Sequence, residues 1–89
     1  MLRVKIYKLE LSKAFEKSIG RLSGKEQQAI AGKLKILAEN PHHPSLRTKK
    51  VQRLKDVFES SVNMDIRILW MYKGDRIILL IDTGHHDII

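Results

Sequence analysis

The residues best suited to chemistry stand near the end of the chain. The segment Asp82-Thr83-Gly84-His85-His86-Asp87 follows five consecutive aliphatic residues, 77–81, three of which are β-branched. Such a run is typical of a strand that is buried on both faces and is therefore central in its sheet. Imidazole takes up and releases a proton near neutral pH, so histidines on so rigid a support are suited to acid–base chemistry. We therefore place the functional site at this end of the chain.

The two adjacent histidines are not equivalent. If the strand continues, His85 and His86 point to opposite sides of the sheet, so at most one of them faces a site. Asp87 either orients a histidine or simply ends the strand. We predict no metal and no cofactor, because adjacent histidines lack the spacing of zinc-binding helices and the sequence has neither cysteine nor an HExxH motif.

The first half of the chain predicts one strand and two helices. The alternation of polar and apolar residues over 3–9 is that of a strand with one wet face. Between Leu11 and Leu22 the apolar residues recur at helical spacing, and Ser23 followed by Glu26 has the spacing of a capping box that begins a second helix. That helix ends at 40–41, an Asn-Pro pair. Two helices joined by so short a turn form an antiparallel hairpin that covers one face of a sheet.

The second half predicts the sheet. Strands are expected over 57–62, 66–72 and 77–81, with Gly74 and Asp75 supplying the positive φ angles of a tight turn. The order β-α-α-β-β-β is an α+β fold, a single domain over residues 1–89. In this fold the helical hairpin is packed on one face of a small antiparallel sheet, and the other face is open.

Three side chains of the strand over 66–72 have two interpretations each. Arg67 alternates with isoleucines, so it lies on the open face, where it either meets a ligand or simply faces solvent. Trp70 and Tyr72 either stack on a nucleobase or, as is usual for aromatic residues inside a strand, belong to the core.

The charge balance points to an anionic partner. Seventeen Lys and Arg against ten Asp and Glu give a net charge of +7 on 89 residues. Nucleic acid, an acidic protein or a membrane surface would all suit it, although charge also serves solubility alone. Five of the cations fall within nine residues: Arg47, Lys49, Lys50, Arg53 and Lys55. The lack of cysteine, of a signal peptide pattern and of a membrane-spanning run predicts a cytoplasmic protein with no membrane association.

Several segments, in order along nearly the whole chain, resemble the RelE/ParE superfamily of toxins from bacterial toxin–antitoxin pairs. The His-Pro-Ser-Leu segment and the terminal His pair are most similar to the YafQ-like branch, whose members cleave mRNA on the ribosome. The residues that carry the likeness are Asn40-Pro41-His42-His43-Pro44-Ser45-Leu46-Arg47, Leu54-Lys55-Asp56-Val57-Phe58-Glu59, Asp65-Ile66-Arg67-Ile68-Leu69-Trp70, Gly74-Asp75 and Gly84-His85-His86-Asp87.

This resemblance implies a metal-independent endoribonuclease. In that reaction a ribose 2′-OH attacks the adjacent phosphate and leaves a 2′,3′-cyclic phosphate and a 5′-OH. The resemblance implies His86 as general acid or base, with His85 as the other candidate. Arg67 would stabilise the phosphorane, because its guanidinium stays charged and matches phosphate oxygens. His43 and Asp65 would assist, whereas His42 is expected simply to be exposed.

The match to the family pattern has gaps. The additional histidine of YafQ-like toxins falls near Ser61, and the tryptophan after their aspartate is Ile66. The lysine pair of the RelE-like branch falls near Glu59 and Ser61. The aromatic residue that closes the family's last strand has no counterpart before the chain ends at Ile89.

The resemblance also implies partners and an alternative function. The partners are a cognate acidic antitoxin, in a toxin–antitoxin hetero-oligomer, and the ribosome with its mRNA. The five cations within 47–55 are expected to contact the RNA backbone. The alternative is a non-enzymatic ParE-like toxin that binds and poisons DNA gyrase and needs no acid–base residues.

Overall fold

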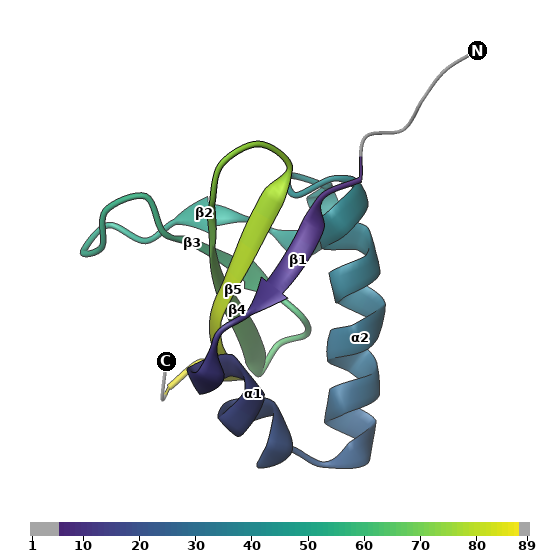
Figure 1. The fold of residues 1–89 in the computed structure, drawn as a ribbon. Coiled ribbons are helices and arrows are strands. Elements are labelled where there is room, and N and C mark those ends of the chain that lie inside the picture. The colour runs from purple at the N-terminus through teal and green to yellow at the C-terminus, as the bar shows by residue number, and fades with distance from the viewer. Residues whose placement is uncertain (1–5, 88–89) are drawn as a thin grey trace.

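The computed structural model describes residues 6–87, in which two helices cover one face of a five-stranded sheet (Figure 1). The predicted α+β fold with a helical hairpin on one face of the sheet is confirmed. The elements are β1 (Lys8–Leu11), α1 (Lys13–Gly20), α2 (Gly24–Glu39), the short 3-10 helix η1 (Pro44–Leu46), β2 (Lys49–Lys50), β3 (Phe58–Ser61), β4 (Ile66–Tyr72) and β5 (Ile77–His85).

The strands are arranged in the order β1-β5-β4-β3-β2. The aliphatic run therefore lies inside the sheet, between β1 and β4, as predicted. The pairs β2–β3, β3–β4 and β4–β5 are antiparallel, but β1 pairs with β5 in parallel, so the sheet is mixed rather than purely antiparallel. The β4–β5 hairpin leaves one edge of β5 unpaired, and β1 fills that edge from the other end of the chain.

Serine caps begin both helices. The side chain of Ser12 accepts a hydrogen bond from the Phe15 amide at 3.0 Å and donates one to the Ile81 carbonyl at 2.6 Å, which ties the start of α1 to β5. The predicted capping box of Ser23 and Glu26 is present at the start of α2. Leu11, which helical spacing had assigned to the first helix, ends β1 instead, because the cap at Ser12 separates strand from helix. Residues 3–5 of the predicted first strand lie outside the described residues.

The turn between β4 and β5 is partly as predicted. Gly74 has the expected positive φ of 74°, but the second positive φ, 58°, belongs to Arg76 and not to Asp75. The turn was predicted at the right place in the sequence, but its second residue with a left-handed conformation is Arg76, one position after the predicted Asp75.

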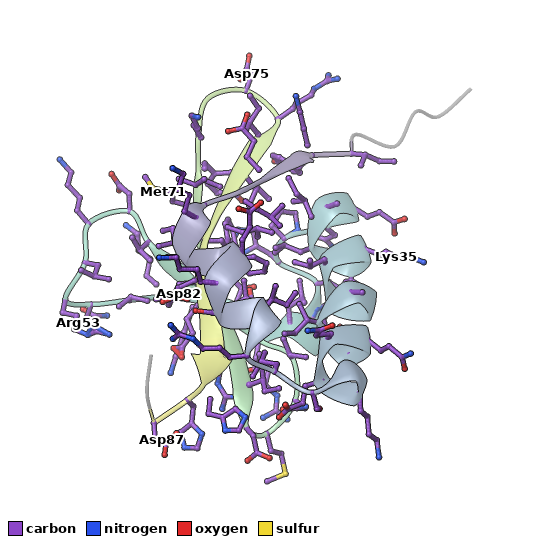
Figure 2. All side chains as sticks on the ribbon, turned by 60° about the horizontal axis from the view of Figure 1, so that its bottom comes forward. Lys35, Arg53, Met71, Asp75, Asp82 and Asp87 are labelled. Atoms are coloured by element: carbon purple, nitrogen blue, oxygen red, sulfur yellow. The ribbon has the colours of Figure 1, made fainter. Side chains whose placement is uncertain are left out.

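The basic segment forms an edge of the sheet. Lys49 and Lys50 form β2, a strand of two residues that pairs with Glu59 and Phe58 of β3. The chain then leaves the sheet as a loop that projects beyond it over 51–56 (Figure 1), with Arg53 far out on this loop (Figure 2).

The core lies between the helices and the sheet. Trp70 is fully buried there, so its stacking on a nucleobase is excluded and the core interpretation is confirmed. Its indole Nε1 donates to the Ser60 hydroxyl at 2.8 Å, and Ser60 in turn bonds the Thr48 hydroxyl at 2.7 Å. Tyr72 is half-buried at the end of β4, 5.7 Å from the ring of Tyr7. The other buried core residues are Phe15, Ile30, Leu37, Leu46, Val62, Ile66, Ile68, Ile78 and Leu80.

The buried hydroxyl of Ser60 is expected to matter more than that of its neighbour. Ser60→Ala removes the partner of a fully buried indole N–H, and an unsatisfied buried donor costs about 1–3 kcal/mol. Ser61→Ala, on the opposite face of the same strand, is expected to change stability by no more than about 0.5 kcal/mol. Urea unfolding of both variants measures the difference, and equal midpoints would show that the indole bond contributes nothing.

Candidate functional site

One extra residue in β5 decides which way the terminal histidines point. Leu69 of β4 pairs with Asp82, but the next residue, Trp70, pairs with Leu80, so Ile81 is left without a partner. This β-bulge shifts the alternation of β5 by one residue. The positions that face the helices are therefore Ile78 and Leu80 before the bulge and Thr83 and His85 after it.

His85 consequently lies on the helix side, across from the buried Ile66. Its Nε2 is 3.0 Å from Oε2 of Glu26. The other carboxylate oxygen of Glu26, Oε1, accepts a hydrogen bond from the Ser23 amide at 2.9 Å. The Ser23 amide and, after it, His85 hold the pKa of the Glu26 carboxyl below its ordinary value. His85 is thus engaged with the start of α2.

His86 lies at the joined ends of β4 and β5 and is exposed. Its backbone N–H donates to the carbonyl of Asp65 at 2.7 Å. The side chain of Asn63 accepts the amides of Asp65 and Ile66 at 2.9 and 2.8 Å, which holds the turn before β4. Two of the candidate residues, His86 and Asp65, are therefore brought together by backbone hydrogen bonds.

Arg67 lies on the open face of the sheet, as its alternation predicts. The residues directly across from it, Ser61 on β3 and Gly84 on β5, are small. It is nevertheless not fully exposed, as a solvent-facing arginine would be: 21% of the side chain is accessible. Nη1 donates to the carbonyls of Asn63 at 2.7 Å and Met64 at 3.2 Å, so the turn before β4 holds the head group in place.

Glu59 is the acidic residue that forms an ion pair with Arg67. It is on the open face of β3, with Oε2 at 3.9 Å from Nε of Arg67 and Oε1 at 3.7 Å from Nζ of Lys49. Sequence reasoning treated Glu59 only as a gap in the family pattern. Its alternation with Phe58 and Ser60, whose side chains face the core, was the signal that places it beside Arg67.

His43 is the N-cap of η1 and organises this short helix. Its Nδ1 accepts the Ser45 amide at 3.1 Å and lies 2.9 Å from the Ser45 hydroxyl. Because Nδ1 is the acceptor of a backbone N–H, the proton of the neutral ring is on Nε2, which is a donor. In this arrangement His43 can give a hydrogen bond to a ligand but cannot take a proton through Nδ1.

His42 has more contacts than an exposed loop residue needs. Although it is exposed, its ring packs edge-on against Phe58 with centroids 6.0 Å apart, and its Nε2 is 3.3 Å from the Tyr72 hydroxyl. His42 is therefore exposed, as expected, and also contacts the half-buried aromatic residues Phe58 and Tyr72.

The basic segment divides between two hollows. The first, which we call the loop hollow, has a volume of about 520 Å³ and lies over β2 and the open face of β3 and β4. The second, the turn hollow, has a volume of about 370 Å³ and lies beside the turn before β4. The loop hollow is lined by Lys49, Lys50, Val51, Gln52, Arg53, Glu59 and Leu69. The turn hollow is lined by Lys33, Ser45, Arg47, Ser61, Val62, Asn63, Met64 and Arg67.

Of the five basic residues within 47–55, only Arg47 therefore lies with Arg67. Lys49, Lys50 and Arg53 line the loop hollow, and Lys55 is farther out on the projecting loop. Lys33 of α2 joins the turn hollow, and its place three residues after the buried Ile30 was a signal that it lies near the packed face of the helix.

Over residues 6–87, no three or more His, Asp or Glu side chains are grouped as a metal site requires. Within the same residues no helix has the length and apolar character needed to cross a membrane.

Solved structures with the same fold were found, but no protein-family model matches the sequence and no curated protein is significantly similar to it. One is the archaeal RelE–RelB complex from Pyrococcus horikoshii OT3, with a TM-score of 0.75 at 15% identity over 90% of this chain and 94% of that one. The DinJ–YafQ toxin–antitoxin complex of E. coli gives 0.71 at 17% identity over 93% and 96%. The YoeB/ParE toxin from Agrobacterium tumefaciens gives 0.77 at 11% identity over 89% and 98%. The fold is therefore that of RelE/ParE-like toxins, as the sequence resemblance implied.

The contacts of Glu26 with the Ser23 amide and, after it, with His85 are expected to make stability depend on pH. The folded pKa of Glu26 is lowered, so its charge contributes stability above the ordinary glutamate pKa of about 4.3, and that contribution is lost as the pH falls through the folded value. Glu26→Gln keeps an acceptor for the cap but removes the charge. Urea midpoints at pH 7, 5 and 3 should show the wild type ahead of the variant at the two higher values, with the difference closing at the lowest. A difference that does not change with pH would contradict this.

Proposed function

We propose that the chain is the toxin of a type II toxin–antitoxin system and acts as an endoribonuclease on ribosome-bound mRNA, thereby inhibiting translation. The observation that supports it best is the joined end of β4 and β5. There the exposed His86 and Asp65 share a backbone hydrogen bond, and Arg67 is held on the adjacent open face. The RelE/ParE-like fold, shared with toxins that occur in complexes with antitoxins, supports the same assignment.

The proposed reaction needs no metal. The ribose 2′-oxygen loses its proton to a base and forms a bond to the adjacent phosphorus, while the bond from phosphorus to the 5′-oxygen breaks and that oxygen takes up a proton. His86 serves as acid or base at neutral pH, and Arg67 stabilises the phosphorane oxygens, which carry more negative charge than the starting diester. His43 assists as a hydrogen-bond donor through Nε2, and Asp65 orients His86.

The proposed partners follow from the charge. An mRNA held by the ribosome presents phosphates to the loop hollow and the turn hollow, which contain most of the cations of the basic segment. A cognate acidic antitoxin, partly disordered alone, neutralises the same net charge of +7 when it wraps the domain in a hetero-oligomer. Both partners place the protein in the cytoplasm.

A second function, non-enzymatic binding and poisoning of DNA gyrase in the manner of ParE-like toxins, is favoured by one observation. The Arg67 head group is engaged by backbone carbonyls and lies 3.9 Å from Glu59, so it must rearrange to hold a phosphorane. A pure binder has no need of that rearrangement.

Primer extension on cellular mRNA after induction separates the two functions, since gyrase poisoning leaves transcripts uncut. We expect cleavage in the coding region. His86→Ala and Arg67→Ala should each slow it by about 10²-fold or more, because each removes a group that acts in the transition state. His85→Ala is the matched control and should cut at a rate near the wild type. Wild-type cleavage by the His86 variant, with loss in the His85 variant, would reverse the assignment of the two histidines.

RNA binding is expected to depend on the loop hollow through charge. Replacing Lys49 and Arg53 by Gln should reduce the slope of log affinity against log salt by about 1.4, because each phosphate that a cation no longer neutralises on a single strand lowers it by about 0.7. The control pair, Lys13 and Lys17 on α1, is exposed and carries the same charge but lies on the helix side. Equal slopes for the two double variants would mean that binding follows net charge and not the loop hollow.

A further inference from the structure

We propose that the turn hollow is a phosphate-binding site for single-stranded RNA and that Lys33 of α2 is one of its ligating cations. This proposal rests on the proposed function, because RNA is taken as the substrate. It goes beyond the proposed function because Lys33 lies outside the basic segment and on the helical layer. The site holds a nucleotide next to the one whose phosphate meets Arg67.

The hollow is built at a place where the sheet edge is open. β2 is only two residues long and pairs with Phe58 and Glu59, so the edge of β3 beyond Glu59 has no strand beside it. The helix η1, anchored by the buried Leu46, packs against both α2 and β3 there. Ser45 of η1, Arg47 directly after it, Lys33 on α2 and Arg67 on β4 consequently line one concave surface.

Two of the three cations of this surface, Lys33 and Arg47, are available for an external anion, whereas Arg67 is paired with Glu59. Within the described residues Lys33 and Arg47 form no ion pair, and no carboxylate lines the turn hollow. The loop hollow differs, since Glu59 lines it and pairs there with Lys49. A phosphodiester therefore replaces no internal partner of Lys33 or Arg47 when it enters the turn hollow.

Arg47 has a left-handed conformation, with φ 47° and ψ 44°, at the end of η1. Its side chain lines the hollow. Arg67 donates through Nη1 to the turn carbonyls beside the hollow, so its head group must rearrange to contact a phosphate there.

Met64 indicates a nucleotide rather than a small anion. Its side chain is 87% exposed, the highest value among the large apolar residues of the described chain, and it lines the same hollow as the three cations. An apolar, polarizable side chain beside a phosphate site suits the face of a nucleobase. The chemistry that the hollow fits is thus a phosphate with an attached base.

The test uses Lys33→Gln and its matched control Lys35→Gln, which lies two residues away on the same helix. Lys33 is half-buried and lines the hollow, whereas Lys35 is exposed and points away from the sheet (Figure 2). The probe is a fluorescein-labelled single-stranded RNA hexamer with 2′-O-methyl riboses, which has no free 2′-OH and so is not cleaved. Fluorescence anisotropy measures its affinity for the purified chain between 0.05 and 0.5 M salt, about the range over which phosphate contacts weaken.

Lys33→Gln should weaken binding about fivefold at 0.1 M salt and reduce the salt slope by about 0.7, the effect of one phosphate contact on a single strand. Lys35→Gln should leave both unchanged. Equal effects of the two variants, or no binding of the hexamer by the wild type, would overturn the proposal. It would also be overturned if Lys33→Gln weakened binding of an acidic peptide and not of the RNA. Because the probe cannot be cut, a chain that binds it as expected but cleaves no mRNA would refute the endoribonuclease and leave this site standing.

Discussion

The β-bulge at Ile81 is the constraint on which the arrangement of the site depends. With regular pairing, His86 would share the helix-facing side with Leu80, and His85 would be on the open side. One unpaired residue exchanges them, so His85 meets Glu26 at the start of α2 and the exposed His86 follows at the end of the sheet. The bulge is tolerated because β5 is held elsewhere along its length, by β4 on one edge and by β1 and the Ser12 hydroxyl on the other.

The open face is organised from beneath by a buried chain of polar groups. Trp70, Ser60 and Thr48 join β4, β3 and the segment after η1 by hydrogen bonds, and Thr48 also donates to the carbonyl of Pro41. No buried side-chain nitrogen or oxygen in the described chain lacks a partner. Since a buried polar group without a partner costs more than the bond itself contributes, this chain keeps η1 and the start of the basic segment in one place relative to the sheet.

The acidic residues leave much of the positive charge free. Glu10 pairs with Lys73 at 2.9 Å, and this hydrogen bond lowers the pKa of its carboxyl, while Glu26 is engaged with Ser23 and His85. Glu59 forms ion pairs with Lys49, which lines the loop hollow, and with Arg67. The net charge of +7 includes cations at the β2 edge and beside the turn before β4, which is where an anionic strand would meet the candidate residues.

The sequence by itself determined the elements, because their signals are local. Helical spacing, the capping box at Ser23, the aliphatic run before Asp82 and the glycine of the turn each depend on residues close in the chain. Each predicted its element, apart from Leu11, which ends β1 and does not belong to the first helix. The likeness to RelE/ParE toxins also rests on the order of such segments. Only the tertiary structure decided that β1 pairs in parallel, that His85 turns to α2, and that Lys33 joins Arg47 and Arg67. The direction of His85 depends on the unpaired residue in β5, and the place of Lys33 beside Arg47 and Arg67 depends on the packing of η1 against α2. Neither cause leaves a periodic pattern in the sequence.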